Sequence, residues 1–521
     1  MECKYYIQYS HLYNKPRLKE NEIIERIKRL DKEKSLKLLS YWMNLVDNFS
    51  LDANYILNCL KHYYMLDLTL NDKSFNKFYF NNGSIFEFQL LLFAFKWVLF
   101  YGSSNKCGEP NKNLANELIE VLIALADYLP QDEVADCPIE FIWSTLHLHT
   151  MKVPKFELAR AYKIYCLNNK FNNKYNNDFI ASYGISIEEY LKIMFRFING
   201  IFDTNLFSDW ISIDCLDNRT KNFLINFAKP YETFKQLPIE VVKNSWQYDI
   251  FFKNPIVIEN NFVHPIAGRI ICSNFFEYLF FKIKLTSNNK EFYQEFGVVF
   301  ENYVQELTEN TCHNNLQYIN EFEYDAKKSS DCYIWSDKTL FIIEAKSKAP
   351  KDETYLMKNK EQIEEAVQKL AIEPICQADR FYQYIVNDNR SNSFKEMDKS
   401  IEEIFVISVS MEKIQPISQL YLDIKKKFNK DTKYFIKGNK KEFSTKLKTK
   451  KIKVGINLNI YDYEKLCAII ENKGIDIAKD ILMQSYNNAE PLDNIIINEN
   501  LSDLKSSFVE KNFELFTVLY K

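Results

Sequence analysis

Glycine and proline are scarce in this chain, which has only 10 glycines and 13 prolines among 521 residues. Because these two residues dominate tight turns, we expect a helix-rich protein with few such turns. The 11 cysteines are scattered singly, without a C-x-x-C pair, and their number is odd. This pattern argues against a disulfide framework or a zinc module and is typical of reduced thiols, so we place the protein in the cytoplasm.

A hydrophobic run long enough to cross a membrane is also lacking. The most apolar window, residues 85–101, is interrupted by Glu87, Gln89 and Lys96, and its longest apolar run covers only residues 90–95. A spanning helix needs about 20 apolar residues. The first residues of the chain lack the apolar core of a signal peptide. We therefore expect a buried helix at 85–101, no export and no membrane association.

Neither sign of charge dominates, because the net charge is only -3. A uniformly basic surface for nucleic acid is thereby excluded, and any such contact must come from a local cluster. Residues 421–454 form one, with 13 lysines against three acidic residues. These lysines would bind nucleic acid with an affinity that falls steeply with salt, or they would form a solvated loop. The pattern is compatible with either alternative. Phosphate-binding glycine motifs are missing, so ATP or dinucleotide use is not expected.

The first half of the chain shows helical periodicity in its apolar residues. We predict a mostly helical recognition or regulatory region at 1–285, joined near residues 287–289 to a second domain at 286–521. Its helices are predicted at 19–49 (two helices), 51–66, 85–101, 113–128, 155–168, 187–202, 222–227 and 270–283, with loops at 103–112 and 168–178 and a short hairpin at 254–265.

The second half alternates between helical and strand patterns. A helix is predicted around an apolar stripe that leaves Glu301 outside it; the stripe is Phe296, Val299, Phe300, Tyr303, Val304 and Leu307. The following elements are predicted as strands at 317–324, 333–335, 340–343, 404–410 and 453–458, and as helices at 354–370, 378–386 and 462–472, followed by an amphipathic tail at 501–520. This order places a hairpin in the middle of a sheet flanked by helices.

That hairpin brings charged residues together. Residues 333–335 and 340–343 are aromatic or branched and flank a polar turn, which is typical of two antiparallel strands. In the register set by the turn, Asp331 lies opposite Glu344, and opposed side chains are about 5 Å apart on one face. Lys346 shares this face because side chains alternate along a strand. Two carboxylates so close repel each other unless a cation lies between them, so we predict a divalent metal site.

The same residues carry a family resemblance. Asp331, twelve intervening residues and the Glu-Ala-Lys triplet at 344–346 resemble the signature of the PD-(D/E)XK, or restriction-endonuclease-like, nuclease superfamily, with Ser330 where the nominal motif has proline. The helix with Glu301 resembles the Glu-bearing first helix of many members. The resemblance covers about half the chain. It implies an α+β protein, with a helical N-terminal region and a C-terminal restriction-endonuclease-like α/β core whose mixed sheet is flanked by helices.

The resemblance implies a nuclease that hydrolyses phosphodiester bonds with Mg²⁺, for which Mn²⁺ would substitute. Asp331, Glu344 and the carbonyl of Ala345 would hold the metal. Lys346 would orient the attacking water or offset charge in the transition state. Glu301 would add a further carboxylate, although a Glu on a polar helix face is often simply solvated.

Nucleic-acid contacts are expected from residues beyond the motif. Lys348 and Lys351 directly follow it and could contact phosphate. Gln377, with Tyr382 further on, resembles a Gln-Tyr element of some members, although helix packing also explains it. The resemblance favours DNA over RNA, because most relatives cut DNA. It also associates stand-alone members that carry an added half with prokaryotic antiviral defence.

Alternatives to a nuclease stay open at this point. The N-terminal half is expected to recognise a target, a trigger or a partner protein, or to form a homodimer. The chain could instead be a non-catalytic scaffold, built on a nuclease-like core, that binds nucleic acid or protein. Retention of the Asp, Glu and Lys of the motif argues against that reading. An enzyme of another class has no group of residues to support it.

Overall fold

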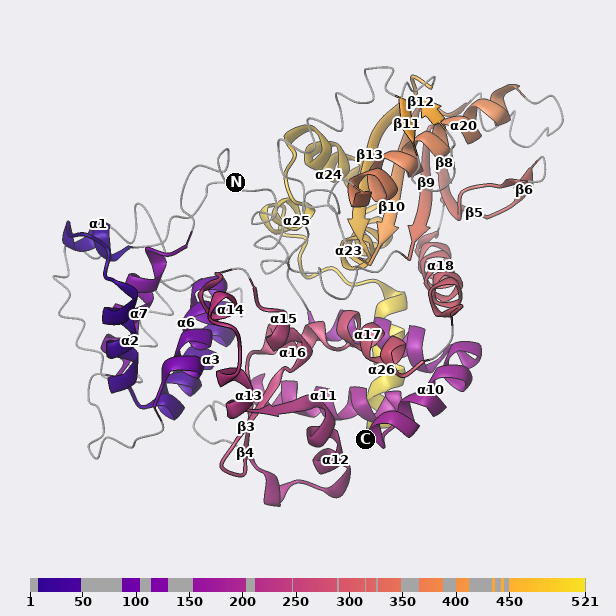
Figure 1. Ribbon diagram of the computed structural model, residues 1–521. Helices are drawn as coiled ribbons and strands as arrows, with labels where there is room; N and C mark the ends of the chain where they lie inside the picture. Colours follow the sequence, from indigo (N-terminus) through magenta and orange to yellow (C-terminus); the bar gives the residue numbers. More distant parts are fainter. Residues whose placement is uncertain are drawn as a thin grey trace. The chain divides into compact units, whose positions relative to one another are not determined.

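The computed structural model describes residues 8–47, 87–103, 114–129, 153–202, 211–245, 247–287, 290–313, 315–324, 327–347, 365–387, 400–411, 433–435, 442–444 and 449–520. These residues form a mixed α/β protein with two mixed sheets (Figure 1). Contacts divide the chain into a first unit, Met1–Pro154 and Asn177–Lys282, and a second unit, Lys155–Asn176, Ile283–Thr354 and Lys358–Lys521. Among the described helices, none is both long enough and apolar enough to cross a membrane.

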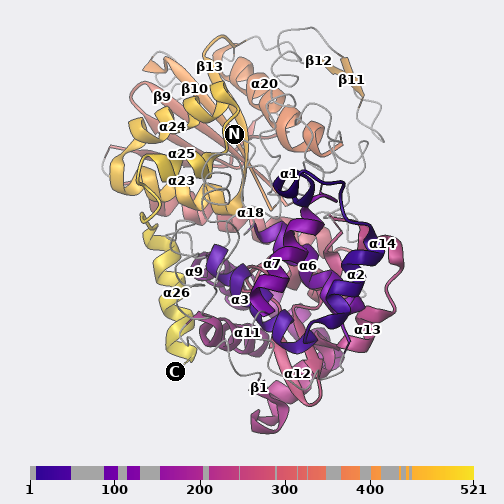
Figure 2. The same ribbon diagram turned by 90° about the vertical axis from the view of Figure 1, so that its left-hand side faces the viewer.

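The first unit is largely helical. Its helices include α1 (Tyr9–Tyr13), α2 (Glu20–Arg29), α3 (Lys32–Asp47), α6 (Phe88–Tyr101), α7 (Leu114–Ala126), α11 (Ile187–Phe202), α12 (Asn218–Phe227), α13 (Tyr231–Lys235), α14 (Ile239–Lys243) and α15 (Asp249–Lys253). Helix α6 packs against α3 and α7 (Figure 2). The predicted helices at 19–49, 85–101, 113–128 and 187–202 are confirmed, whereas the one predicted at 51–66 lies outside the described residues.

Helix α6 is buried along almost its whole length, including its one lysine, Lys96. The Lys96 ammonium donates hydrogen bonds to three main-chain carbonyls, those of Val241 at 2.9 Å, Asn244 at 2.5 Å and Gln247 at 3.1 Å. Burial lowers the pKa of Lys96 to about 7. The polar residue that interrupts the apolar run is thus satisfied by carbonyls of α14 and of the residues that follow it, as a buried donor must be.

A four-stranded sheet completes the first unit, in the order β1-β4-β3-β2. Its strands are β1 (Ile211–Ser212), β2 (Ala228–Pro230), β3 (Ile256–Glu259) and β4 (Phe262–Pro265). The predicted hairpin is confirmed as β3 and β4, which are joined by Asn260 and Asn261 with φ of 47° and 67°. Asparagine tolerates this left-handed backbone, which a two-residue hairpin turn requires. Strands β1 and β2 extend the hairpin beyond what the sequence predicted.

The predicted helix at 270–283 is wrong as a single element. The structure has two helices, α16 (Gly268–Ser273) and α17 (Glu277–Thr286), with a break at Asn274. The Asn274 side chain donates to the carbonyls of Phe252 at 2.8 Å and Ile270 at 2.9 Å. Asparagine side chains compete for backbone partners in this way, which ends a helix that apolar periodicity alone would continue.

The predicted loop at 168–178 is also wrong, because these residues lie in helix α10 (Asn169–Tyr183). Its many asparagines suggested a loop. However, Phe171, Tyr175 and Phe179 are spaced four residues apart and all three are buried. This aromatic stripe on one helix face outweighs the weak helix propensity of asparagine.

The second unit is built around a five-stranded mixed sheet in the order β13-β10-β9-β8-β5. Its strands are β5 (Gln317–Asn320), β8 (Cys332–Ser336), β9 (Thr339–Lys346), β10 (Glu403–Ser410) and β13 (Ile452–Asn459). The predicted hairpin is confirmed as β8 and β9, with Cys332 opposite Ile343. Strands β9, β10 and β13 are parallel, whereas β5 and β8 are antiparallel to their neighbours.

Helices cover both faces of this sheet. The second unit contains α9 (Pro154–Ala161), η1 (Tyr162–Cys166), α18 (Phe292–Thr311), η3 (Gln368–Ile372), α20 (Glu373–Asn387), α23 (Ile460–Lys473), α24 (Ile475–Asn488), α25 (Leu492–Asn498) and α26 (Ser507–Tyr520). Helix α20 packs on the face that presents Leu340 and Ile342. Helix α18 lies against the other face, where Cys332 contacts Thr308. All six residues of the predicted α18 stripe are buried.

Helix α20 lies very close to the sheet. A Cβ atom on Gly455 of β13 would come within 2.2 Å of Cδ1 of Ile375, so any other residue there would require the Ile375 side chain to move. The predicted pair of helices at 354–370 and 378–386 is wrong in its described part, because helical structure is continuous from residue 365 to 387 through the π-helical turn η3. Pro374 lies within this stretch, directly after η3 and at the start of α20.

Candidate metal centre

The β8–β9 hairpin ends in a pair of buried carboxylates. Leu340 and Ile342 of β9 face α20, and alternation places Glu344 and Lys346 on the same face. Asp331 precedes β8 and is the next residue outward from the Cys332–Ile343 pair, which sets it opposite Glu344. Both carboxylates are buried, Glu344 with only 5% of its surface exposed. The structure therefore brings together the Asp, Glu and Lys that the sequence selected.

Asp331 is held by main-chain contacts. Its Oδ2 accepts a hydrogen bond from the amide of Ala345 at 2.5 Å. Its carbonyl accepts another from the side chain of Gln305 on α18, at 3.1 Å. Burial raises the pKa of Asp331 above its usual range, and the charges of Glu344 and Glu301 raise it further. The ionised form of Asp331 is thus disfavoured in the metal-free site, and a nearby cation would stabilise it.

Glu344 has one oxygen with partners and one without. Oε1 accepts hydrogen bonds from Lys346 at 2.6 Å and from Gln377 of α20 at 3.0 Å. Oε2 is buried and has no hydrogen-bond partner within the part of the chain that the structure describes. A buried carboxylate oxygen without a partner is costly, so its position suits a ligand atom for a cation.

Lys346 stays cationic in this site. Burial lowers its pKa, but the charges of Glu344 and Asp331 and the hydrogen bond to Glu344 raise it more, so the net shift is upward. Its side chain is 29% exposed. The ammonium therefore reaches solvent while it is bonded to Glu344.

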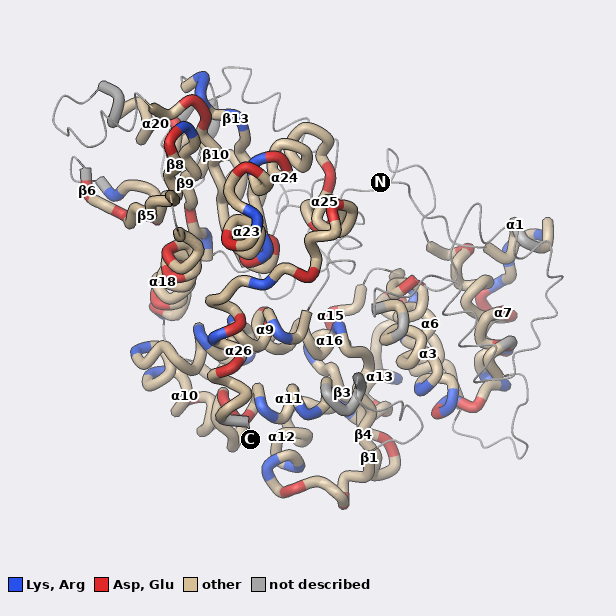
Figure 3. Tube along the Cα trace, turned by 180° about the vertical axis from the view of Figure 1, so that it is seen from behind, with Lys and Arg blue, Asp and Glu red and all other residues tan. Residues whose placement is uncertain are grey.

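Helix α18 supplies a further carboxylate, Glu301. This helix carries four acidic residues and no basic one, as its red segments show in Figure 3. Its Gly297 lies near the end of β9, since a Cβ there would be 3.1 Å from the Ser347 hydroxyl. Glu301 is partly buried, and burial and the charge of Glu321 raise its pKa. The predicted helix is thereby placed with its Glu beside the hairpin.

Glu321 joins this group, although it was not among the predicted residues. One carboxylate oxygen from each of Glu301, Glu321 and Asp331 lies within 4.8 Å of the other two. Glu321 follows β5, in which Asn320 pairs with Cys332. The next pair outward sets Glu321 opposite Asp331, just as Glu344 is on the other side. The register between β5 and β8 would have identified Glu321, but the sequence alone does not give this register.

The remaining predicted residues have mixed outcomes. Gln377 lies at the site and donates to Glu344, while its predicted contact with nucleic acid stays a prediction. Lys348, Lys351 and most of the lysine-rich segment 421–454 lie outside the described residues. Its described lysines at 450–453 lie beside the start of β13. Because β9, β10 and β13 are parallel, this is the opposite end of the strands from Lys346.

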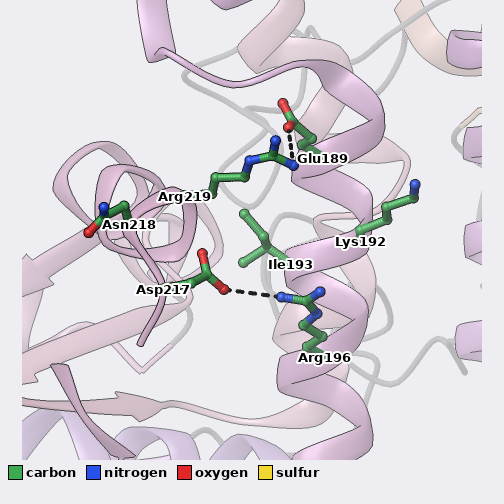
Figure 4. A pocket seen from close by; sticks show the side chains of 7 residues that line it. All are labelled: Glu189, Lys192, Ile193, Arg196, Asp217, Asn218 and Arg219. Carbon is green, nitrogen blue, oxygen red and sulfur yellow. Dashed lines mark hydrogen bonds and ion pairs between the residues drawn. The ribbon is translucent and has the colours of Figure 1, made fainter. Parts of the chain in front are cut away.

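A pocket in the first unit involves none of the predicted residues. Its volume is about 420 Å³ and it lies between α11 and the start of α12 (Figure 4). Four of the charged groups that line it form two pairs, Arg219 with Glu189 at 3.1 Å and Arg196 with Asp217 at 3.3 Å. The fifth, Lys192, pairs at 2.7 Å with Glu188 of the same helix. The pocket therefore shows no group of charges that lacks a partner.

The carboxylate group at the hairpin has the chemistry of a divalent-cation site. Its oxygens are the ligands that Mg²⁺ and Ca²⁺ prefer, and Lys346 adds a cation beside them, at 2.6 Å from Glu344. Bound metal and ammonium together would suit a phosphate substrate. Comparison of the chain with models of protein families, with curated proteins and with solved structures found no match.

Proposed function

We propose that the protein is a Mg²⁺-dependent nuclease that hydrolyses phosphodiester bonds of DNA at the site around Asp331 and Glu344. The observation that carries this proposal is the buried Oε2 of Glu344, which no described residue hydrogen-bonds and which belongs to a carboxylate opposite the buried Asp331. Two carboxylates removed from water in this way need a cation. The resemblance to PD-(D/E)XK nucleases, carried by the same residues, supplies the reaction and the preference for DNA.

The chain's own residues fit the metal that this function needs. Asp331 and Glu344, with the Ala345 carbonyl that the resemblance implies, would hold it. Bound Mg²⁺, or Mn²⁺ in its place, lowers the pKa of a coordinated water and neutralises charge on the phosphate. Lys346 and Gln377 fix one oxygen of Glu344, so that the other can bind a cation without losing a hydrogen bond.

In the metal-free site the charges of Glu344 and Asp331 raise the pKa of Lys346, which favours its protonated form. A protonated ammonium beside the carboxylates orients the attacking water or offsets charge that grows on the phosphate in the transition state. The partly exposed side chain makes both roles geometrically accessible.

The direct test is cleavage of supercoiled and linear DNA by the purified full-length protein. We expect nicking and linearisation with Mg²⁺ or Mn²⁺ and none with EDTA, measured on agarose gels. Single-stranded RNA of equal length serves as the comparison for substrate class. Folded protein that neither cuts nucleic acid nor binds metal would favour the non-catalytic scaffold, and faster cleavage of RNA would overturn the choice of DNA.

Metal binding should strengthen as the pH rises from 6 to 8. The raised pKa of Asp331, caused by burial and by Glu344 and Glu301, means that a metal must displace a proton. One competing proton weakens binding by up to about tenfold for each pH unit below that pKa. The metal-free protein should meanwhile lose stability as the pH rises, because its native state binds this proton more tightly than the unfolded chain does.

Calorimetric titration with Mn²⁺ at pH 6 and pH 8 checks the first expectation, and thermal unfolding of metal-free protein at the same two pH values checks the second. Equal Mn²⁺ affinity at both would show that Asp331 is already ionised at pH 6.

A further inference from the structure

A small arm leaves the sheet directly before Asp331. It follows β5 and carries the short strands β6 (Glu323–Tyr324) and β7 (Lys327–Lys328), which project from the edge of the sheet in Figure 1. Two hydrogen bonds close its base, from the Ser329 amide to the Phe322 carbonyl at 2.9 Å and from the Phe322 amide to the Ser329 hydroxyl at 3.0 Å. The arm thereby holds Glu321 and Asp331 side by side at its two ends.

Lys328 of the arm lies beside the cluster of carboxylates formed by Glu301, Glu321 and Asp331. Its ammonium is 2.9 Å from a carboxylate oxygen of Glu321. The hydrogen bond and charge of Glu321, with the charges of Glu301 and Asp331, raise the pKa of Lys328. All three carboxylates therefore attract the exposed ammonium of Lys328, which serves as their counter-ion.

Among the described residues, the carboxylates of the site outnumber its ammonium groups. The carboxylates of Glu301, Glu321, Asp331 and Glu344 face the ammonium groups of Lys328 and Lys346. When all are ionised, the excess is two negative charges. Independently of this group, the Oε2 atom of Glu344 is buried and has no hydrogen-bond partner among the described residues. Since Glu344 lies opposite Asp331 in the hairpin, this atom points to a missing cation at the same end of the hairpin.

The distances between the carboxylate oxygens of Glu301, Glu321 and Asp331 are close to those between the ligands of a metal ion. The three oxygens lie within 4.8 Å of one another, and two oxygens on opposite sides of Mg²⁺ are about 4 Å apart. Glu301 and Glu321 are only partly buried, so their side chains can close this gap by rotation.

We infer that Glu321 is a ligand of the divalent cation, and that Lys328 is the internal cation that occupies its carboxylate until the metal binds. This inference rests on the proposed function, because it concerns the same metal site. It adds a residue outside the Asp, Glu and Lys of the hairpin, and it makes metal binding a competition with an ammonium of the arm. Once displaced, Lys328 is free to contact a phosphate of the substrate.

The test is Mn²⁺ binding to full-length variants, measured by calorimetry at low ionic strength. Glu321→Gln should weaken Mn²⁺ binding by about tenfold or more, as loss of a contact to a metal site does. Lys328→Met should strengthen it severalfold, because no ammonium then has to be displaced. In the Glu321→Gln background, Lys328→Met should have no further effect.

Lys338 and Glu402 provide matched controls. They form an exposed ion pair at 2.8 Å beside the turn of the same hairpin, and Lys338 is 68% exposed compared with 67% for Lys328. Lys338→Met and Glu402→Gln should leave Mn²⁺ affinity unchanged. If Glu321→Gln and Lys328→Met behave like these controls while Glu344→Gln weakens binding, the inference fails and the proposed function stands. If the wild-type protein binds no Mn²⁺, both fail.

Discussion

Replacing Lys346 with alanine should reduce metal-dependent DNA cleavage by about 10²-fold or more, the usual effect of removing one charged group that stabilises a transition state. The isosteric change Glu344→Gln should reduce it by at least as much, because it removes a metal ligand. Cleavage rates of supercoiled DNA in Mg²⁺, measured under single-turnover conditions, give both values.

The two variants should differ in stability, which separates chemistry from folding. Glu344→Gln removes one of two buried like charges, so the metal-free protein should become no less stable. Lys346→Ala instead leaves Glu344 Oε1 with Gln377 as its remaining hydrogen-bond donor among the described residues, which should lower the melting temperature. Lys338→Ala, in the turn of the same hairpin, is the control and should retain full activity. Wild-type cleavage rates in both site variants would exclude this site as the active centre.

Replacing Arg160 with methionine should destabilise the second unit by about 3–5 kcal/mol, the range for breaking a buried ion pair on one side. Arg160 of α9 is fully buried and bonds Glu464 of α23 through two nitrogens, at 2.8 and 2.7 Å, and Glu157 at 3.0 Å. Tyr303 of α18 donates to the same Glu464 at 2.6 Å. Without the guanidinium, two buried carboxylates would lose their cation.

Hydrogen–deuterium exchange measures this effect locally. In Arg160→Met, amides of α9 and α23 should exchange faster, and the urea midpoint should fall. Arg196→Met is the matched control, because Arg196 pairs with Asp217 at 3.3 Å and both side chains are more than half exposed. Such pairs contribute less than about 1 kcal/mol. Unchanged exchange in both variants would show that the buried network adds nothing to stability.

The hairpin with its charged residues was predictable because a short polar turn sets its register. Once 336 and 339 flank the turn, every pair outward follows, including Asp331 with Glu344. The same reasoning would pair Glu321 with Asp331. It could not be applied, because the β6–β7 arm separates β5 from β8 and no tight turn sets the register between them. The residues of the turn thus predict that Glu344 lies opposite Asp331, but they do not predict the position of Glu321.

Long-range packing explains most of what the sequence did not predict. Glu157 and Arg160 look like an ordinary surface pair three residues apart on a helix, and only Glu464, 304 residues further along the chain, shows that the pair is buried. Likewise, α10 depends on the burial of Phe171 and Tyr175, which its asparagine-rich sequence concealed. Propensity and periodicity are local, whereas these contacts are not.

The path of the chain through its two units restricts how the protein can be divided. Residues Lys155–Asn176 belong to the second unit, although stretches of the first unit precede and follow them in the sequence. A fragment that begins near residue 286 would lack Arg160 and would leave Glu464 without the guanidinium that neutralises it. Neither unit is therefore one continuous piece of the sequence. A chain that rejoins residues 155–176 to the second unit would keep Arg160 beside Glu464.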